Sequence, residues 1–175
     1  MKEKLTEPGK DNVVLIGMPG AGKSTLGVVL AKIMGYNFLD ADLLIQNQCD
    51  RTLQRLIDAC GPEGFIQVEN QVLSDISAER TVIATGGSAV YSEAAMKHLS
   101  EIGRIVYLQI SYDELKARLT DFQERGVVLK GGVGMSLRDL YAERLPLYEE
   151  YADYVVNVDD LTITAAARKV ADALK

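Results

Sequence analysis

The sequence predicts an α/β fold built on a mostly parallel sheet with helices on both of its faces. Short apolar or β-branched runs alternate with longer segments of helical periodicity, which is typical of parallel strands joined by helices. The first apolar run is followed at once by a glycine-rich turn and then by a helical segment. The length of 175 residues fits one domain that can bury a sizeable core.

The first half of the chain shows two strand patterns and three helical patterns. Residues 13–16 are a continuous apolar run, as expected of a strand buried on both faces. Gly35 is expected to cap the first helix at its C-terminus, and Gly61-Pro62 separates the second helix from the third. The expected elements are a strand at 13–16, a helix at 23–34, a strand at 36–39, and helices at about 42–59 and 63–77.

The second half continues the alternation, with one interruption. Between residues 121 and 134 the periodicity is lost and glycines accumulate, which indicates a mobile loop because regular structure resumes on both sides. Pro146 predicts a kink or break in the helix that follows. The expected elements are strands at 81–85, 104–110 and 154–158, and helices at 92–101, 112–120, 136–151 and 161–174. Residues 1–12 read as a polar tail, which leaves 13–175 as a single domain.

Composition excludes several classes of protein. Hydrophobic residues make up 47% of the chain and charged residues 25%, which is ordinary for a globular protein and excludes global disorder. A formal net charge of −6 argues against extended nucleic acids and anionic membranes as partners. The polar N-terminal segment and the short apolar run after it match neither a signal peptide nor a membrane span, so we expect a cytoplasmic protein. Cys49 and Cys60 lack metal-binding spacing and are expected to be reduced thiols.

A phosphate-binding loop follows the first strand. Residues 17–24 read Gly-Met-Pro-Gly-Ala-Gly-Lys-Ser, which matches GxxxxGK[ST] in the strand–turn–helix context that this motif requires. Backbone N–H groups and the helix N-terminus would surround phosphate oxygens. Lys23 would reach the β- and γ-phosphates of a nucleoside triphosphate, and the Ser24 hydroxyl would ligate Mg²⁺. The residues expected to bind the nucleotide are Gly20, Ala21, Gly22, Lys23, Ser24 and Thr25.

Two carboxylates follow the second strand. Strand alternation would put Asp40 and Asp42 on the same face, at the sheet edge that borders the ligand crevice of a parallel sheet. There a carboxylate can hold metal-bound water or accept a proton from an attacking hydroxyl group. The alternative is that the pair caps the next helix, Asp42 especially.

Gly86-Gly87 ends the third strand, where close approach of the backbone to a ligand needs small residues. A simple tight turn is the alternative reading. Arg118, Arg125 and Arg144 are scattered around the glycine-rich segment, and each taken singly reads as a solvated surface residue.

Taken together, these motifs resemble the shikimate kinases, small P-loop kinases related to the nucleoside-monophosphate kinases. The resemblance covers the chain from about Asn12 to Lys175, and it rests on the order of the motifs. That order is the P-loop, Asp40-Ala41-Asp42, Phe65 with Glu69, Gly86-Gly87, Arg118 with Arg125, and Arg144-Leu145-Pro146-Leu147-Tyr148, which is similar to the R-x-P-L-Y of the family.

The resemblance implies a five-stranded parallel P-loop kinase core, a helical substrate-binding subdomain at about residues 43–74, and a mobile lid at about 122–134. It also implies transfer of the ATP γ-phosphoryl group to the 3-hydroxyl of shikimate in aromatic amino-acid biosynthesis, by a protein that is commonly monomeric. The roles that it implies are Asp42 as base and ligand of the substrate hydroxyls, Asp40 in the Mg²⁺ water shell, Gly86 and Gly87 at the substrate, Arg144 on the substrate carboxylate, Arg118 against adenine, and Arg125 on the transferred phosphoryl group.

The acceptor half of the motif set departs from the family. Its F-R-x-x-E reads here Phe65-Ile66-Gln67-Val68-Glu69, so Ile66 stands where an arginine would fork onto the shikimate carboxylate. The third glycine of the family's G-G-G is Ser88, the lid's R-P-L-L reads Arg125-Gly126-Val127-Val128, and the adenine loop is shortened near residues 159–161. Arg55 could replace the missing cation.

Three functions stay open at this point. The first is an active kinase of shikimate. The second is an active kinase of another small hydroxylated acid or amino acid, which Ile66 favours. The third is a nucleotide-binding module without catalysis, against which the retained Lys23, Ser24, Asp40, Asp42 and Arg125 argue.

Overall fold

The computed structural model describes residues 10–119 and 135–175. Its strands are β1 (Asn12–Ile16), β2 (Asn37–Asp40), β3 (Thr81–Ala84), β4 (Gly103–Gln109) and β5 (Tyr154–Asn157). The helices of these residues are α1 (Lys23–Met34), α2 (Ala41–Cys49), α3 (Leu53–Ser74), α4 (Glu93–Ile102), α5 (Tyr112–Arg118), α6 (Leu137–Tyr151) and α7 (Ile163–Ala173), with a short 3₁₀-helix η1 (Ala89–Tyr91). None of these helices is long and apolar enough to cross a membrane.

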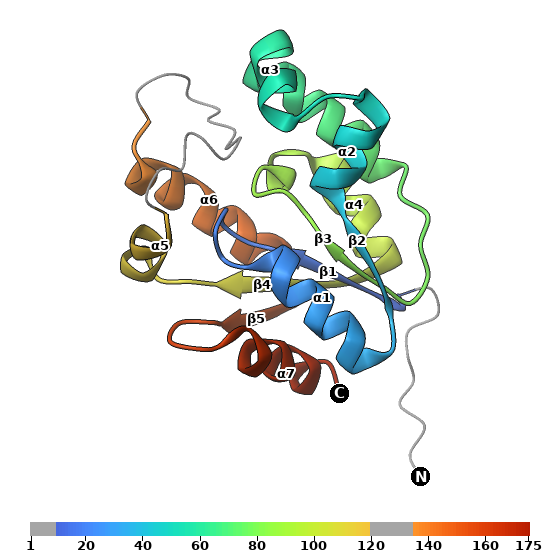
Figure 1. Cartoon of the computed structure of the whole chain (residues 1–175), viewed down its shortest axis with the longest axis vertical. Coiled ribbons are helices and arrows are strands. Elements are labelled where there is room, and N and C mark those ends of the chain that lie inside the picture. The colour runs from blue at the N-terminus through green and yellow to red at the C-terminus, as the bar shows by residue number, and fades with distance from the viewer. Residues whose placement is uncertain (1–9, 120–134) are drawn as a thin grey trace.

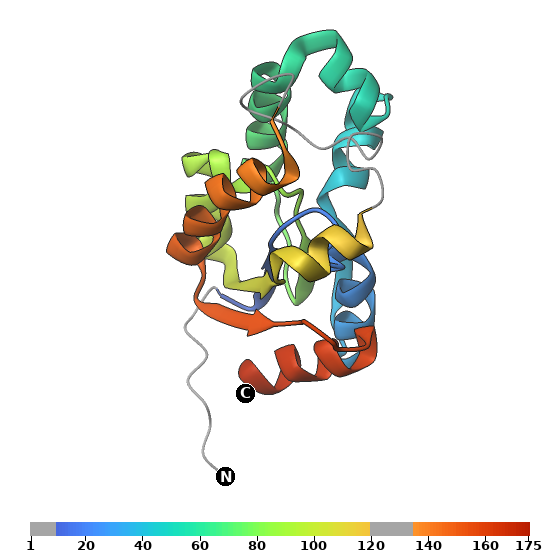
Figure 2. The same cartoon turned by 90° about the vertical axis from the view of Figure 1, so that its left-hand side faces the viewer.

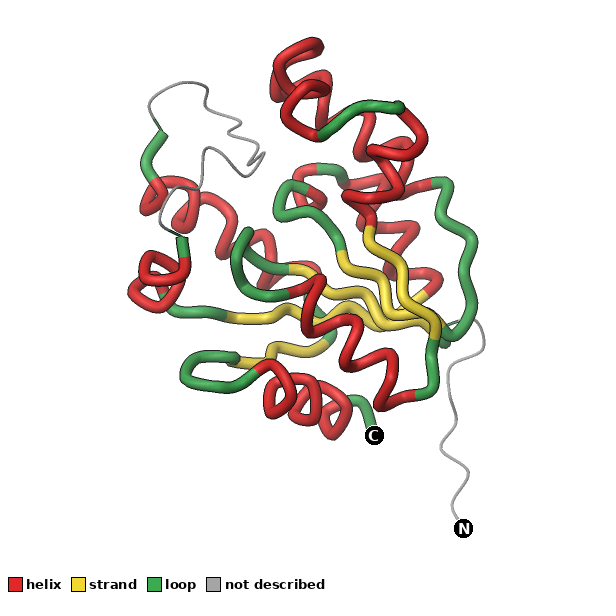
Figure 3. The backbone as a smooth tube through the Cα atoms, viewed as in Figure 1, coloured by secondary structure: helices red, strands yellow, loops and turns green. Residues whose placement is uncertain are grey.

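All five strands are parallel and lie in the order β2-β3-β1-β4-β5 (Figures 1 and 3). The central strand β1 pairs with β3 through Val14 and Ile83, and with β4 through Val14 and Ile105. The carboxyl ends of β2, β3 and β1 therefore lie side by side. The P-loop, the start of α2 and the Gly86-Gly87 loop leave the sheet at this edge.

Helices cover both faces of the sheet, as the alternation predicts. Helices α1 and α7 lie together on one face, and α4 and α6 lie on the other (Figures 1 and 2). The β1 residues Val13–Ile16 are fully buried, which explains their uninterrupted apolar run. Helices α2 and α3 rise beyond the carboxyl edge of the sheet (Figure 1).

The expected single helix at 42–59 is wrong. The chain forms α2, leaves the helical path at residues 50–52, and starts α3 at Leu53. Asp50 adopts a left-handed conformation with φ 49°, and the Thr52 hydroxyl accepts a hydrogen bond from the Arg55 N–H. A C-terminal cap and an N-terminal cap thus stand almost next to each other, and no glycine or proline marks the boundary.

The expected break at Gly61-Pro62 is present as a kink within α3. Gly61 leaves helical geometry there, with φ 72° and ψ 172°, and glycine adopts this positive φ without strain. Pro62 lies where a new helical turn begins and needs no N–H donor there. Pro146 lies inside α6, which continues to Tyr151. Gly35 caps α1 in a left-handed conformation, as expected.

Candidate active site

The P-loop wraps around the N-terminus of α1. Gly20 and Gly22 have φ angles of 84° and 91°, and a Cβ on Gly20 would lie 2.8 Å from the Leu119 side chain. Both positions therefore need glycine. The Ala21 N–H donates to the Met18 carbonyl, and α1 begins directly at Lys23. The unpaired N–H groups of this helix start are a ready anion site.

Lys23 is buried inside this loop. Its Nζ donates to the carbonyl oxygens of Gly17 and Met18, at 2.7 and 2.9 Å. Burial lowers the pKa of Lys23 to about 8, and the nearby Asp42 carboxylate opposes that shift. The ammonium group is therefore still mostly charged at neutral pH, as phosphate binding requires.

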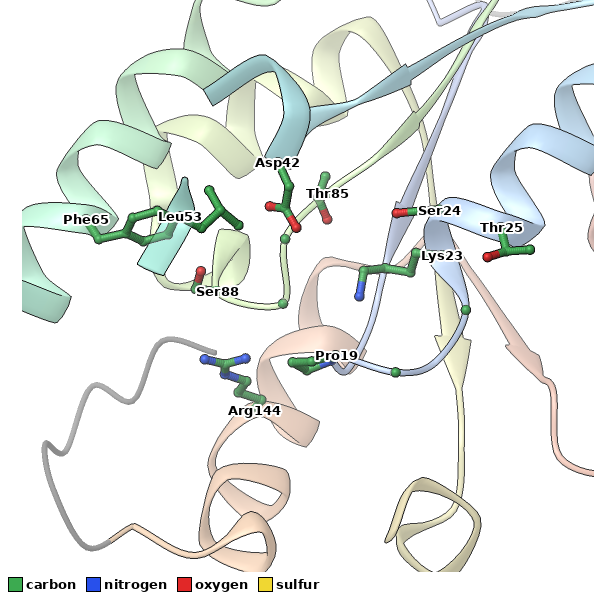
Figure 4. A pocket seen from close by; sticks show the side chains of 14 residues that line it. Pro19, Lys23, Ser24, Thr25, Asp42, Leu53, Phe65, Thr85, Ser88 and Arg144 are labelled. Atoms are coloured by element: carbon green, nitrogen blue, oxygen red, sulfur yellow. The ribbon is translucent and has the colours of Figure 1, made fainter. Parts of the chain in front are cut away.

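Asp40 and Asp42 do not share a strand face, so that expectation is wrong. Strand β2 ends at Asp40, whose Oδ1 accepts hydrogen bonds from the N–H groups of Asp42 (3.0 Å) and Leu43 (3.3 Å). Asp40 is thus the N-cap of α2, the role that the sequence suggested more strongly for Asp42. Asp42 lies in the first turn of α2 and points into a cleft (Figure 4). Burial raises the pKa of the Asp42 carboxyl group, and Lys23 counteracts that rise.

The cleft has a volume of about 320 Å³ and is lined from five parts of the fold: the P-loop with α1, α2, α3, the loop after β3, and α6. Of the expected site residues it brings together Gly20, Gly22, Lys23, Ser24, Thr25, Asp42, Gly86, Gly87 and Arg144. Ala21 is buried within the loop, and Asp40 and Arg118 do not line the cleft. Arg125 and the expected lid at 122–134 fall outside the described residues.

The Gly86-Gly87 loop lies between the charged groups of the cleft. A Cβ on Gly86 would lie 2.5 Å from Glu69 Oε1 and 2.9 Å from Asp42 Oδ1. A Cβ on Gly87 would lie 2.8 Å from Arg144 Nη1. Any larger residue would push these groups apart, so the glycines are needed because of crowding rather than for a tight turn alone.

Arg144 is fully buried in α6 and still lines the cleft. Its Nε donates to the Tyr91 hydroxyl at 3.1 Å, and its guanidinium lies 5.1 Å from the centre of the Tyr91 ring. The Tyr148 hydroxyl donates to the Gly87 carbonyl at 2.7 Å, and its ring stacks on Tyr107. Arg144 is therefore a fixed cation in the wall of the cleft and not a solvated surface residue.

Sequence reasoning missed Tyr91 and underrated Tyr148. Tyr148 ends the motif Arg144-Leu145-Pro146-Leu147-Tyr148, so its place beside Arg144 could have been suspected from that motif. Tyr91 lies in η1, which no pattern in the sequence predicts.

Glu69 and Ser88 form a buried pair at the wall of the cleft, which Ser88 lines and Glu69 does not. The Ser88 hydroxyl donates to Glu69 Oε2 at 2.6 Å, whereas the buried Oε1 has no partner among the described residues. Burial raises the pKa of Glu69 to about 7, and the Ser88 hydrogen bond opposes that rise. From the sequence alone, Glu69 served only to align the Phe65–Glu69 segment with the family motif F-R-x-x-E.

The missing arginine is not replaced by a neighbour in the described part of the chain. Ile66 packs with the apolar cluster of α2 and α3 and does not line the cleft. Arg55 is exposed and also does not line it. Among the described residues, the cations that line the cleft are Lys23 and Arg144. Arg118 donates from Nε and Nη2 to Glu114 Oε1, one turn earlier in α5.

A P-loop at the carboxyl edge of a parallel sheet, with a carboxylate and a buried arginine across one cleft, defines a P-loop kinase of small molecules. The chain belongs to the shikimate kinase family, whose model matches residues 19–175. This confirms the resemblance that the motifs carry.

Relatives of known name agree with this assignment. The chain is 36% identical to a shikimate kinase of Vibrio vulnificus over 95% of this chain and 97% of the relative. It is 37% identical to one of Pseudomonas aeruginosa over 94% and 96%. A structure of the Acinetobacter baumannii shikimate kinase in complex with shikimate matches with a TM-score of 0.82 and 30% identity, covering 93% of this chain and 92% of that one. The Aquifex aeolicus enzyme matches with a TM-score of 0.79 and 27% identity, over 93% and 95%.

Proposed function

We propose that the protein transfers the γ-phosphoryl group of ATP to the 3-hydroxyl of shikimate. The observation that carries this proposal is the arrangement of Figure 4, in which Asp42 faces Lys23 and Ser24 while Arg144 approaches from the opposite side. Family membership supports the reaction, and the relative bound to shikimate supports the acceptor.

The chain's own residues supply position and charge. The P-loop N–H groups and Lys23 would hold the phosphates of ATP, with Arg118 against adenine and Arg125 on the transferred group. Asp42 would hold the substrate hydroxyls and accept the proton of the attacking one. Arg144 would pair with the substrate carboxylate, with Gly86 and Gly87 beside the bound acid and the Gly87 N–H donating to it. A lid at 122–134 would exclude water, which competes as a phosphoryl acceptor.

The donors present fit Mg²⁺ as a cofactor. The described residues hold no group of three or more His, Cys, Asp or Glu that could cage a metal. Mg²⁺ suits such a site because it keeps several waters and binds mainly through substrate phosphates. Ser24 would be a direct ligand, and Asp40, whose Oδ1 caps α2, would reach the water shell only through its other oxygen. When bound, the ion neutralises charge on the phosphates.

We also propose that residues 43–74 form the substrate-binding subdomain. Leu53 and Phe65 from this segment line the acceptor side of the cleft. A cytoplasmic monomer stays our expectation for the whole protein. The net charge of −6, which gives no attraction to anionic membranes, supports it.

The second candidate is a kinase of another small hydroxylated acid or amino acid, which the apolar packing of Ile66 favours. The third is a nucleotide-binding module without catalysis. ATP turnover with Mg²⁺ should be measured against shikimate, homoserine and gluconate in parallel. We expect shikimate to give the highest kcat/KM. Turnover with another alcohol alone would replace the acceptor, and ATP binding without any turnover would favour the module.

A further inference from the structure

Glu69 is a buried carboxyl group that the proposed mechanism does not use. It lies on α3 with 1% of its surface exposed. Oε2 is held by the Ser88 hydroxyl at 2.6 Å, and Oε1 is buried without a partner among the described residues. A buried carboxyl group that is only half satisfied is costly, which suggests that the position serves the site rather than stability.

The free oxygen of Glu69 lies directly behind the acceptor end of the cleft. Glu69 Oε1 and Asp42 Oδ1 approach the same side of Gly86, within 2.5 and 2.9 Å of the point that a Cβ would occupy. Asp42 and Gly86 both line the cleft. The charge on Glu69 is therefore felt where the substrate acid is expected to bind.

Several titratable groups face Glu69 from the elements packed around it. They are Asp42 of α2, Lys23 of α1, and Arg144 and Tyr148 of α6. Ile66, one helical turn earlier on α3, has no donor to offer. The Ser88 hydroxyl is thus the hydrogen-bond donor that the described structure gives to this carboxyl group.

We propose that Ser88 is a positioning residue which, by holding the Glu69 carboxyl group behind Asp42 and Gly86, controls the negative charge that an anionic acceptor meets at this end of the cleft. The inference rests on the proposed function, because it assumes that the acceptor is a small acid. With Glu69 neutral, Arg144 faces the acceptor carboxylate with less competition. With Glu69 ionised, a second carboxylate beside Asp42 repels that acid.

The direction of the Ser88 effect follows from its hydrogen bond. This bond favours the ionised form of Glu69, and burial, which raises its pKa to about 7, favours the neutral form. Loss of the Ser88 hydroxyl leaves burial unopposed, so Glu69 should stay neutral to higher pH. A bond to a charged group is typically worth enough to move the titration midpoint by about one pH unit.

The first test measures Glu69 in the ligand-free protein, so it does not depend on activity. Side-chain carboxyl ¹³C shifts are followed against pH, and the Glu69 signal is assigned by its loss in Glu69→Gln. We expect a midpoint near neutral pH, moved upward by about one pH unit in Ser88→Ala. Ser92→Ala is the matched control, because Ser92 is also buried but its hydroxyl has no partner among the described residues. A Ser88→Ala midpoint equal to the native one would overturn the proposal.

The second test measures the KM of the acceptor acid across the same pH range. In the native protein this KM should rise severalfold as Glu69 ionises with increasing pH. In Ser88→Ala the same rise in KM should occur at higher pH, with kcat little changed. Ser88→Thr keeps a hydroxyl and should restore the native profile. Ser88→Gly serves if Ser88→Ala unfolds, which thermal unfolding reports. Identical KM profiles for native and Ser88→Ala proteins would contradict the proposal. Failure of shikimate as a substrate, with the ¹³C result intact, would instead count against the proposed function.

Discussion

Crowding around Gly86 couples the carboxyl groups of Asp42 and Glu69. A methyl group there would lie 2.5 Å from Glu69 Oε1 and 2.9 Å from Asp42 Oδ1, closer than real Cβ atoms come to oxygen. Gly86→Ala should therefore move both groups and lower kcat/KM for the acceptor by about 100-fold, the usual effect of an ångström-scale misplacement. Calorimetry with an ATP analogue should show nucleotide affinity within about twofold of native, and an equal loss of both would show that the P-loop is disturbed as well.

Asp42 has a role separable from that of its neighbour Asp40. Asp42→Asn keeps the shape of the side chain but removes the proposed base, so we expect phosphoryl transfer to be lost while ATP affinity is nearly unchanged. Steady-state kinetics and nucleotide binding measured on one preparation check this. Loss of both properties together would assign Asp42 a structural role.

Asp40→Ala is the matched comparison for Asp42→Asn. It removes the N-cap of α2 and should reduce the free energy of unfolding by about 1 kcal/mol. Urea unfolding measures that loss, which we expect to exceed the one caused by Asp42→Asn.

Glu69 makes stability depend on pH in a direction opposite to that of a salt-bridged acid. Burial raises its folded-state pKa from 4.5 to about 7, so between these values the folded protein binds a proton that the unfolded chain has released. Stability should therefore fall as pH rises from 4.5 to 7 and level off above. At about 1.4 kcal/mol per pH unit, the free energy of unfolding should fall by about 3 kcal/mol across this pH range.

Glu69→Gln should remove this pH dependence. The difference in unfolding free energy between variant and native protein, measured by denaturant titration at several pH values, should grow in favour of the variant across that window. A constant difference at all pH values would show that Glu69 titrates normally.

At the scale of elements, local sequence predicted the type of each element better than its limits. Helix α1 and its Gly35 cap follow from the P-loop pattern and the glycine, because the determining residues are adjacent in the chain. The separation of α2 from α3 depends on Asp50 in a left-handed conformation and on the Thr52 cap. This boundary contains neither glycine nor proline, the residues that usually indicate the end of a helix in a sequence. The apolar periodicity continues across that boundary, so the pattern alone reads as one helix.

Helix α3 also carries the departure from the family at Ile66, which packs in the apolar cluster around Phe65 and Leu56. An arginine there could keep its aliphatic stem in the cluster and extend its guanidinium toward the cleft. Ile66→Arg should lower the KM for shikimate by about tenfold, because it would add a charged contact to the substrate carboxylate. Arg55→Ala should leave that KM unchanged, since Arg55 is exposed. An unchanged KM in Ile66→Arg would undermine the correspondence drawn between Phe65–Glu69 and the family motif.

At the scale of the molecule, the sheet order brings the site together, and the order cannot be derived from one sequence by periodicity. The P-loop motif pointed to Lys23, and the ends of the second and third strands pointed to Asp42 and Gly87, whereas the family resemblance implied the five parallel strands and the role of Arg144. Contacts between side chains remote in the chain were not accessible. Ser88 and Glu69 are 19 residues apart, and Arg144 and Tyr91 are 53 apart. Such pairs form only because α3, η1 and α6 pack against one another.

The net charge of −6 describes the exterior and not the site. In the proposed function, the N–H groups of one helix start and Lys23 would bind phosphate, and the buried Arg144 would bind the acceptor; the overall charge reports none of these groups. Phosphoryl transfer from ATP to shikimate requires these two halves of the site to act in one reaction. ³¹P NMR of the protein with ATP, Mg²⁺ and shikimate tests it directly, with Asp42→Asn as the inactive control. We expect one equivalent of phosphorylated shikimate for each ADP formed, and ADP without phosphorylated shikimate would contradict the proposed function.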